Sequence, residues 1–235
     1  MAFVVTAPQR PVAAVHGGAE FPVRRIFCIG RNYADHVREM GGDPRADPPV
    51  FFGKPADAVV ASGSALPYPA ATADLHYEGE LVIALGGAGR DLATPAEAGR
   101  LIFGQACGCD LTRRDLQAQA RERGGPWDVA KAFDRSAPLG PIVPVTALPP
   151  ARFDHARLRL TVNGEMRQDA PLAAMIWSVP EILMALSRLF ELQPGDLVFT
   201  GTPQGVGALL PGDRVRVAID PLPPLQFEIA PGPRS

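Results

Sequence analysis

The stretch His76-Tyr-Glu-Gly-Glu80, which runs directly into Leu81-Val-Ile-Ala-Leu85, decides how this chain of 235 residues is expected to fold. Its apolar run, charged at one end, predicts a single strand over Leu75–Leu85. Because side chains alternate along a strand, Glu78 and Glu80 should project to the same face. Two carboxylates at that spacing repel each other unless a cation lies between them or one of them is protonated.

A hard cation would remove this repulsion, and oxygen ligands with open water positions suit Mg²⁺ or Mn²⁺. A third acid, Asp110, ends the apolar, glycine-rich stretch Phe103–Cys109, so its carboxylate is expected to reach a site rather than the solvent. The Glu-x-Glu pattern alone does not decide the matter, because exposed strand faces often carry such pairs. A metal site and a solvated strand face are both open at this point.

The rest of the chain predicts a sheet-dominated α+β fold. Arg25–Gly30 is short, apolar and closed by glycine, as buried strands are. Asn163-Gly164 is typical of a two-residue hairpin turn, and Ser178-Val-Pro-Glu181 of a helix capping box. The 24 Gly and 26 Pro residues indicate many tight turns. We expect a short N-terminal segment, residues 1–24, followed by one main domain over residues 25–235.

Composition argues against two classes of partner. The 23 basic and 25 acidic residues nearly balance, so no nucleic acid and no anionic membrane is expected as a partner. The apolar runs are far shorter than the roughly 20 residues that span a bilayer, and the N-terminus lacks a signal-peptide pattern, so we expect a cytoplasmic protein.

The chain has three cysteines, Cys28, Cys107 and Cys109. Cys107-x-Cys109 could suggest a soft-metal site, but we expect all three to be buried thiols.

Lysine is rare, since only Lys54 and Lys131 occur beside 21 arginines. A compact ammonium group does not replace a planar guanidinium at a tight site, so a lysine can mark a specific role here. Lys54 follows Val50–Gly53, and Lys131 lies within Pro126–Phe133. In such apolar surroundings a positive group could meet a substrate carboxylate or an oxyanion. A composition bias that happened to leave two lysines is the other interpretation.

Two further patterns can carry chemistry. His36 and Glu39 are three residues apart on an expected helix over Tyr33–Met40, so they share a face. A carboxylate bonded to one imidazole nitrogen raises the basicity of the other, as activation of water requires. An ordinary surface pair is the alternative. Arg114 and Gln117 lie one helical turn apart and together could hold a carboxylate.

Six stretches together resemble the fumarylacetoacetate hydrolase family, specifically its short acylpyruvate and fumarylpyruvate hydrolase branch. They occur in family order and are spread over about residues 25–220, nearly the whole chain. The stretches are Ile29–Met40, Phe51–Pro55, His76–Glu80, Asp110–Gln117, Trp127–Phe133 and Thr200–Gly207. Small departures at positions 77 and 79 and at Gly53 remove none of the charged residues.

The resemblance implies a mixed β-sandwich roll, a homodimer and bound Mg²⁺ or Mn²⁺. The implied metal ligands are Glu78, Glu80 and Asp110. The implied catalytic groups are His36 and Glu39, which would activate water, and Lys131, which would face the reacting oxygens. The positions that bind substrate in the family are here Arg31, Lys54, Arg114, Gln117 and Thr202.

The implied activity is metal-dependent hydrolysis of a carbon–carbon bond in an acylpyruvate, a small 2-oxo acid. The loop Gly42–Pro49 and the stretch Phe51–Asp57 most resemble fumarylpyruvate hydrolases of aromatic (gentisate) catabolism, which yield fumarate and pyruvate. The same site could instead decarboxylate oxaloacetate, because both reactions pass through a pyruvate enolate. A non-catalytic module that binds oxo acids is a third interpretation, but such a protein should have lost ligands or the dyad.

Overall fold

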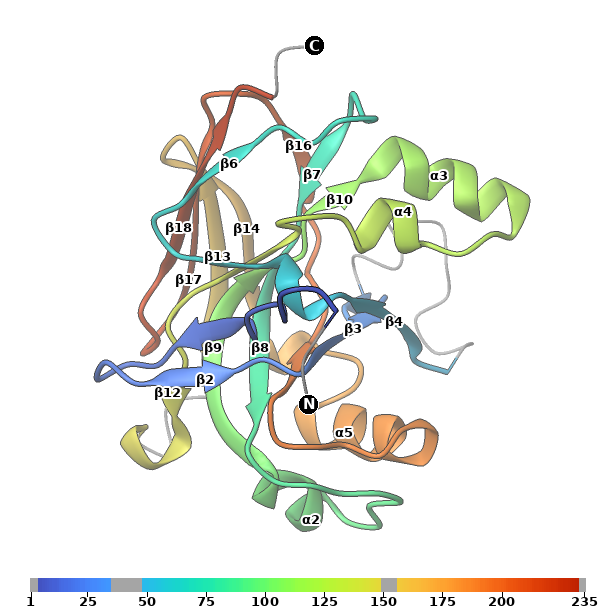
Figure 1. Ribbon diagram of the computed structural model, residues 1–235, viewed down its shortest axis with the longest axis vertical. Helices are drawn as coiled ribbons and strands as arrows, with labels where there is room; N and C mark the ends of the chain where they lie inside the picture. The colour runs from blue at the N-terminus through green and yellow to red at the C-terminus, as the bar shows by residue number, and fades with distance from the viewer. Residues whose placement is uncertain (1–3, 35–47, 149–155, 233–235) are drawn as a thin grey trace.

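The computed structural model describes residues 4–34, 48–148 and 156–232. Strands dominate these residues, as predicted, and form an eight-stranded sheet, a five-stranded sheet and two small sheets (Figure 1). Both larger sheets are mixed, since each combines antiparallel with parallel pairs. The eight-stranded sheet runs β4-β3-β15-β8-β9-β11-β5, with β12 paired to β9. Its strands are β3 (Arg25–Gly30), β4 (Val50–Lys54), β5 (Val59–Ala61), β8 (Gly79–Leu85), β9 (Ile102–Cys109), β11 (Ala137–Leu139), β12 (Val143–Pro144) and β15 (Asp196–Phe199).

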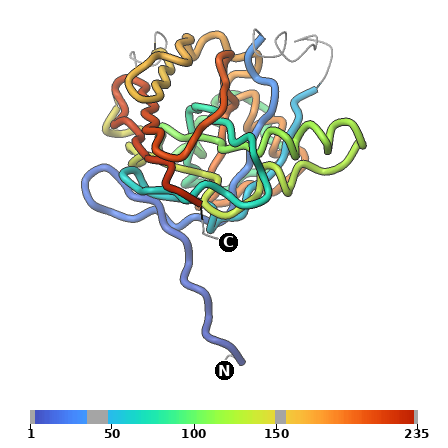
Figure 2. Tube along the Cα trace, turned by 90° about the horizontal axis from the view of Figure 1, so that it is seen from above, coloured from blue at the N-terminus to red at the C-terminus, as the bar shows by residue number. Residues whose placement is uncertain are grey.

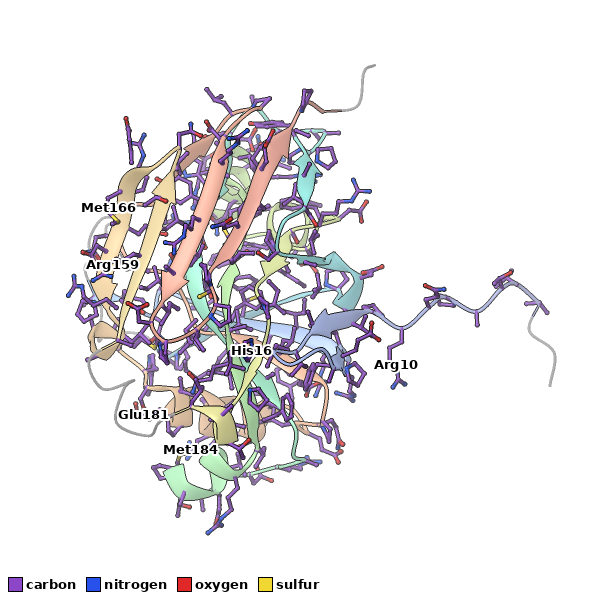
Figure 3. The ribbon with its side chains drawn as sticks, turned by 90° about the vertical axis from the view of Figure 1, so that its left-hand side faces the viewer. Arg10, His16, Arg159, Met166, Glu181 and Met184 are labelled. Carbon is purple, nitrogen blue, oxygen red and sulfur yellow. The ribbon has the colours of Figure 1, made fainter. Side chains whose placement is uncertain are left out.

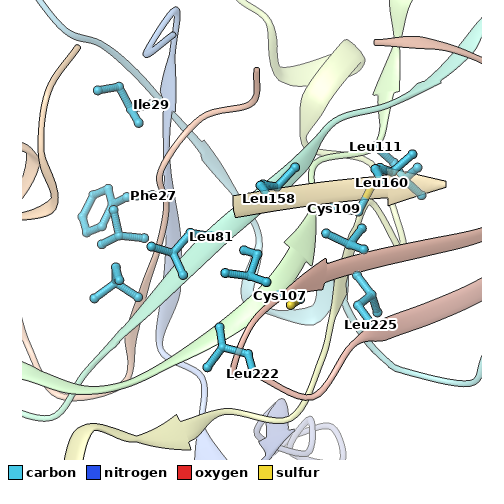
Figure 4. Packing of buried hydrophobic residues seen from close by; sticks show 14 of the residues in the cluster. Phe27, Ile29, Leu81, Cys107, Cys109, Leu111, Leu158, Leu160, Leu222 and Leu225 are labelled. Carbon is cyan, nitrogen blue, oxygen red and sulfur yellow. The ribbon is translucent and has the colours of Figure 1, made fainter. Parts of the chain in front are cut away.

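The five-stranded sheet packs against β8 and β9, and the main core lies between them (Figure 4). Along its strand β13, Leu158 and Leu160 are fully buried in this core, whereas Arg159 points to the solvent (Figure 3). Burying each leucine contributes about 1.5–3 kcal/mol. The order is β14-β13-β17-β18-β6. The strands are β6 (Ala65–Pro67), β13 (Arg157–Val162), β14 (Glu165–Pro171), β17 (Arg214–Ile219) and β18 (Leu225–Ala230).

A bulge lies next to the turn between β13 and β14. Leu160 pairs with Gln168, but Thr161 pairs with Met166, so Arg167 is an extra residue on its strand. Such a bulge changes the direction in which side chains point. Here Gln168 is buried, while Met166 and Arg167 are exposed.

The three-stranded sheet continues two strands of the eight-stranded sheet. Its order is β10 (Thr112–Arg113), β7 (Leu75–Tyr77), β16 (Gly207–Leu209). The chain passes from β7 to β8 at Glu78, and it passes from β9 to β10 through Asp110 and Leu111. The prediction of one strand over Leu75–Leu85 was therefore wrong. The chain passes from one sheet to another at Glu78, and periodicity along the sequence does not reveal such a tertiary change.

The helices lie at two ends of the molecule (Figure 1). At one end α2 (Pro95–Arg100) contacts α5 (Val179–Leu189), and at the other α3 (Arg114–Arg123) contacts α4 (Asp128–Lys131). The remaining short elements are the 3₁₀ turns η1 (Ala56–Ala58), η2 (Val145–Ala147) and η4 (Leu172–Ala174).

Local signals placed several boundaries correctly. Asn163 and Gly164 form the turn between β13 and β14, with positive φ angles of 54° and 85°. At the start of α5, the Ser178 N–H donates to Glu181 Oε2 at 2.8 Å, which confirms the capping box.

The N-terminal segment forms a hairpin of β1 (Val12–Ala14) and β2 (Glu20–Pro22), whose Ala13 and Phe21 pack into a second core cluster. Residues 4–7 extend away from the body (Figure 2). Across the described ranges, no helix is long and apolar enough to cross a membrane.

Candidate active site

Three acidic side chains converge where the chain passes between the two sheets. Glu78 lies between β7 and β8, Glu80 is on β8, and Asp110 follows β9 directly. Each offers one carboxylate oxygen, and these oxygens all lie within 4.8 Å of one another. The residues are 6%, 2% and 0% exposed, so the alternative of a solvated strand face was wrong. The backbone also joins the two crossing points, because the Asp110 N–H donates to the Glu78 carbonyl at 2.8 Å.

Glu80 is held by the loop that follows β15. Its Oε2 accepts a hydrogen bond from the Gly201 N–H at 2.7 Å. Gly201 has a φ of +90°, and a Cβ there would lie 2.7 Å from Asn32 Cβ, so the position requires glycine. Asn32 is fully buried and donates its amide to the Thr200 carbonyl at 2.7 Å. The loop is thereby fixed to the end of β3.

Lys131, the last residue of α4, connects two of the acids. Its ammonium group donates to Glu78 Oε2 at 2.7 Å, to Asp110 Oδ2 at 2.6 Å and to Thr112 Oγ1 at 2.7 Å. All three donors of the group are therefore used, which a compact ammonium allows. Lys131 is 2% exposed, so these contacts lie in the buried floor of the site.

Lys54, the last residue of β4, lies behind Asp110. Its Nζ is 2.8 Å from Asp110 Oδ1, and it donates to the carbonyl oxygens of Leu111 and Lys131. The side chain is fully buried and is absent from the described lining of the pocket. The structure thus places Lys54 where it neutralises a carboxylate and supports the backbone, and its binding of substrate stays a prediction.

The floor carries an excess of buried negative charge at Glu80. Burial raises the pKa of Glu80 well above its ordinary value, and the charges of Asp110 and Glu78 raise it further. Burial alone would lower the pKa of Lys131, but Asp110 and Glu78 outweigh it, so the pKa is raised. Lys131 is consequently a charged donor at neutral pH.

The donor set fits a hard divalent cation. All three groups are carboxylates, and oxygen is the donor that Mg²⁺ and Mn²⁺ prefer. Asp110 Oδ1 is buried and, among the described residues, accepts no well-aligned hydrogen bond despite the nearby Lys54. A cation bound between the three carboxylates would give Asp110 Oδ1 a positively charged partner. It would also offset the negative charge of Glu80.

Arg114, the first residue of α3, joins the acids to that helix. Its Nη2 donates to Glu78 Oε1 at 2.6 Å, and its Nη1 donates to Gln117 Oε1 at 2.5 Å. Its Nε lies 3.3 Å from His76 Nδ1, and His76 Nε2 lies 2.8 Å from Asp74 Oδ1. Burial and the Arg114 charge lower the pKa of His76. A neutral imidazole that accepts from Arg114 and donates to Asp74 satisfies both contacts.

A pocket lies against these groups, with apolar and cationic walls. Phe52 and Trp127 meet edge to face, with ring centroids 5.7 Å apart. Arg121 also lines the pocket, although the sequence analysis did not single it out. Its position four residues after Gln117 was the available signal, because residues at that spacing share a helix face. The lining residues are Ile29, Gly30, Arg31, Phe52, Glu78, Glu80, Arg114, Gln117, Arg121, Trp127, Lys131 and Thr202.

Gln168 supports this pocket from β14 and was also missed. Its Oε1 accepts from the Gly79 N–H at 2.9 Å, and its Nε2 donates to Thr202 Oγ1 at 2.9 Å and to the Pro203 carbonyl at 2.8 Å. The Gln168 side chain thus connects Gly79, the residue between the two glutamates, to the loop after β15. A buried polar residue beside a hairpin turn could have been found only if the bulge had been foreseen.

Two of the expected catalytic residues, His36 and Glu39, lie outside the described residues, so their dyad stays a prediction. Cys28, Cys107 and Cys109 are free and buried, as expected. Burial raises the pKa of the Cys107 thiol to about 12, which keeps it protonated.

Residues 25–230 match the family described as fumarylacetoacetate (FAA) hydrolase C-terminal. This chain belongs to that family. Its resemblance to the fumarylacetoacetate hydrolase fold is confirmed, since a fumarylpyruvate hydrolase from Pseudomonas aeruginosa superposes with a TM-score of 0.92. That protein was solved in complex with Mn²⁺ and pyruvate, is 51% identical, and the match covers 97% of this chain and 99% of that one.

Other members of the family carry different activities. A 5-carboxymethyl-2-hydroxymuconate delta-isomerase from Mycobacterium smegmatis is 32% identical with a TM-score of 0.79, covering 96% of this chain and 83% of that one. The mitochondrial oxaloacetate tautomerase FAHD1 of Rattus norvegicus is 40% identical over 207 residues, 88% of this chain and 91% of the relative. Membership in the fumarylacetoacetate hydrolase family therefore establishes a hydrolase or isomerase, and the site must indicate which.

Proposed function

We propose that this chain is a metal-dependent acylpyruvate hydrolase that cleaves fumarylpyruvate to fumarate and pyruvate in aromatic catabolism. The observation that carries the proposal is the floor of the pocket, where three buried carboxylates converge and a charged lysine donates to two of them. The Pseudomonas aeruginosa relative, named for this activity and solved with Mn²⁺ and pyruvate, supports the substrate class.

Glu78, Glu80 and Asp110 would hold Mg²⁺ or Mn²⁺. When bound, such an ion supplies positive charge that polarises the oxygens of a 2-oxo acid and favours the enolate form of pyruvate. The residues around it then orient the substrate. Arg114 and Gln117 offer donors on one helix face, and Thr202 offers a hydroxyl from the loop opposite.

Cleavage requires water to attack the acyl carbonyl carbon. We assign the base to His36, oriented by Glu39, because the two share a helix face in the sequence. The hydroxyl adds to the acyl carbon, and the bond from that carbon to the methylene breaks. Its electron pair passes into the pyruvate enolate, which regains a proton at the methylene carbon. Lys131 is held charged, and with the carboxylates engaged by the ion one of its three N–H groups would turn to the oxygen that becomes negative, a contribution of about 3–4 kcal/mol for a single donor.

A second candidate is a reaction of oxaloacetate, either tautomerisation or decarboxylation. It is supported by the 40% identity to a relative named oxaloacetate tautomerase. Tautomerisation only moves a proton between carbon and oxygen, and decarboxylation breaks a bond without adding water. Neither reaction needs the proposed water-activating dyad.

The deciding experiment gives metal-stripped protein Mg²⁺ or Mn²⁺ and follows the loss of enol absorbance with fumarylpyruvate and acetylpyruvate. Oxaloacetate is assayed in parallel, and His36→Ala is compared with the unchanged protein. We expect metal-dependent hydrolysis that His36→Ala abolishes, while any oxaloacetate reaction largely persists. Fast turnover of oxaloacetate with no acylpyruvate hydrolysis would replace the first proposal by the second.

We also propose a homodimer, on the basis of the family resemblance. Light scattering coupled to size-exclusion chromatography should give twice the chain mass of 24.9 kDa. A mass of one chain at micromolar concentration would contradict this.

A further inference from the structure

Helix α3 forms one wall of the pocket along its length. Arg114, Gln117 and Arg121 all line the pocket and occupy positions i, i+3 and i+7 of the helix, which lie on one face. Arg114 is anchored at the floor by its 2.6 Å contact with Glu78. At 1.5 Å of rise per residue, Arg121 stands about 10 Å farther along the helix axis, away from the acids. In Figure 1 this helix leads outward from the sheets.

The cationic side chains Lys131, Arg114 and Arg121 of the pocket differ in their partners. Lys131 and Arg114 are bonded to carboxylates of the floor. Arg121 is exposed, and within the described parts of the chain its side chain makes neither a hydrogen bond nor an ion pair. Its guanidinium group is therefore available for an anion, and a planar fork of donors suits a carboxylate.

The pocket also has an apolar wall. Ile29, Phe52 and Trp127 line it, and the two aromatic rings contact each other. The pocket thus has a polar floor, an apolar wall and a cation at the outer end of α3. A molecule with a 2-oxo acid at one end and a carboxylate at the other has the same order of groups. At roughly 1.2 Å per bond of extended chain, a seven-carbon acid spans about 7 Å between its end carbons.

We propose that Arg121 determines specificity by binding the distal carboxylate of the substrate, so the site selects acylpyruvates with a second carboxylate. The inference rests on the proposed function, since it names the residue that recognises the fumaryl end. The floor contacts only the 2-oxo acid end, which all acylpyruvates share, so it does not distinguish one acylpyruvate from another. Arg121 would make that distinction at the other end of the substrate.

The test compares Arg121→Gln with Arg123→Gln, a change of the same charge on the same helix at an exposed residue outside the pocket lining. The substrates are fumarylpyruvate, with two carboxylates, and acetylpyruvate, with one. Arg121→Gln should lower kcat/KM for fumarylpyruvate by about ten- to a hundredfold, the range of a charged hydrogen bond. It should leave kcat/KM for acetylpyruvate within about twofold, and Arg123→Gln should change neither value. Equal losses on both substrates, or none on fumarylpyruvate, would overturn the proposal.

A binding measurement keeps the inference separate from catalysis. The saturated acids 2-oxoheptanedioate and 2-oxoheptanoate lack the second carbonyl, so they cannot be cleaved as acylpyruvates are. Calorimetry with Mn²⁺ present should show tighter binding of the dicarboxylate, and Arg121→Gln should remove that preference.

The two arms fail independently. A preference for the dicarboxylate that depends on Arg121, in a protein that hydrolyses no acylpyruvate, would retain the role of Arg121 and reject the hydrolase. Equal binding of the two saturated acids would reject the role of Arg121 even if fumarylpyruvate is hydrolysed.

Discussion

Two glutamates in different regions of the molecule each accept a hydrogen bond of nearly the same length from a backbone N–H, yet their pKa values shift in opposite directions. Glu80 accepts from the Gly201 N–H at 2.7 Å in the pocket floor, and Glu181 accepts from the Ser178 N–H at 2.8 Å at the start of α5. The pKa of Glu80 is raised by burial and by neighbouring acids. The pKa of Glu181 is lowered by its hydrogen bonds with Ser178. At Glu80 burial and neighbouring charge outweigh the hydrogen bond, whereas at the exposed Glu181 the hydrogen bonds prevail and favour the ionised form.

Glu181 and Glu80 thus have different roles, one at a helix end and one in the pocket floor. At the helix end the carboxylate is exposed and its charge stabilises the first turn. In the floor the carboxylate is 2% exposed, beside two other acids, where its charge is unfavourable unless a cation is bound. Substitutions at the two positions should therefore have opposite consequences for folding and for activity.

The largest effect is expected from Glu80→Gln. The amide removes a metal ligand, so activity should fall about a thousandfold or more, since several kcal/mol of transition-state stabilisation depend on the ion. The rise in Tm on adding Mn²⁺ should disappear as well. The Tm of the metal-free protein should not fall, because a buried charge is lost. Glu181→Gln serves as the matched control and should keep both activity and the metal-induced rise. A large drop in metal-free Tm for Glu80→Gln would break the comparison.

The next largest effect should come from Lys54→Met, which leaves Asp110 and two carbonyl groups buried without this donor. Breaking a buried pair from one side costs about 3–5 kcal/mol. Urea unfolding measures the loss. Arg214→Met is the control, because its ion pair with Glu228 is exposed and should contribute at most about 1 kcal/mol. Similar losses in the two variants would show that the Lys54 pair is no stronger than a surface pair.

A smaller effect is expected from Gln168→Leu. The substitution leaves the Gly79 N–H and the Thr202 loop without their partner, at a cost of about 1–3 kcal/mol for unsatisfied buried groups. Because Thr202 would lose its support, KM for the acylpyruvate should rise more than kcat falls. Gln226→Leu, at an exposed position of the same sheet, is the control. An unchanged KM together with lowered stability would limit Gln168 to a structural role.

The smallest effect is that of Glu181→Gln on stability. The folded pKa of Glu181 lies below its unfolded value, so its contribution is present above the unfolded value and is lost as the pH falls through the folded one. The substitution should cost about 0.5 kcal/mol at pH 7 after solvent screening. The difference from the unchanged protein should vanish in acid. Unfolding curves at several pH values measure it, and a difference independent of pH would contradict the assignment.

Local chemistry in the sequence was sufficient for turns and caps, and insufficient for contacts across the fold. Asn163-Gly164 and the Ser178 capping box depend on neighbouring residues alone, and both were predicted correctly. The convergence of Asp110 with the two glutamates was suggested by the setting of Asp110 and by family resemblance. Its geometric cause is the pairing of β8 with β9, which no periodicity reveals.

Lys54 and Gln168 illustrate the remaining gap. Both have buried side chains whose partners come from distant strands, so their contacts depend on how the sheets stack. The resemblance implied that Lys54 binds substrate, and it did not indicate the contact of Lys54 with Asp110. Gln168 depends on a bulge at Arg167, and one residue more or less in that strand would have pointed it to the solvent.

The passage of the chain between sheets at Glu78 and Asp110 has a mechanical consequence. Glu80 belongs to the large sheet, while the other two acids stand at its border with the three-stranded sheet. An ion coordinated by all three carboxylates would link the two sheets across that border. Local opening of β7 and β10 and escape of the ion would then be a single event, so amide hydrogens in these two short strands should exchange more slowly once Mn²⁺ is added.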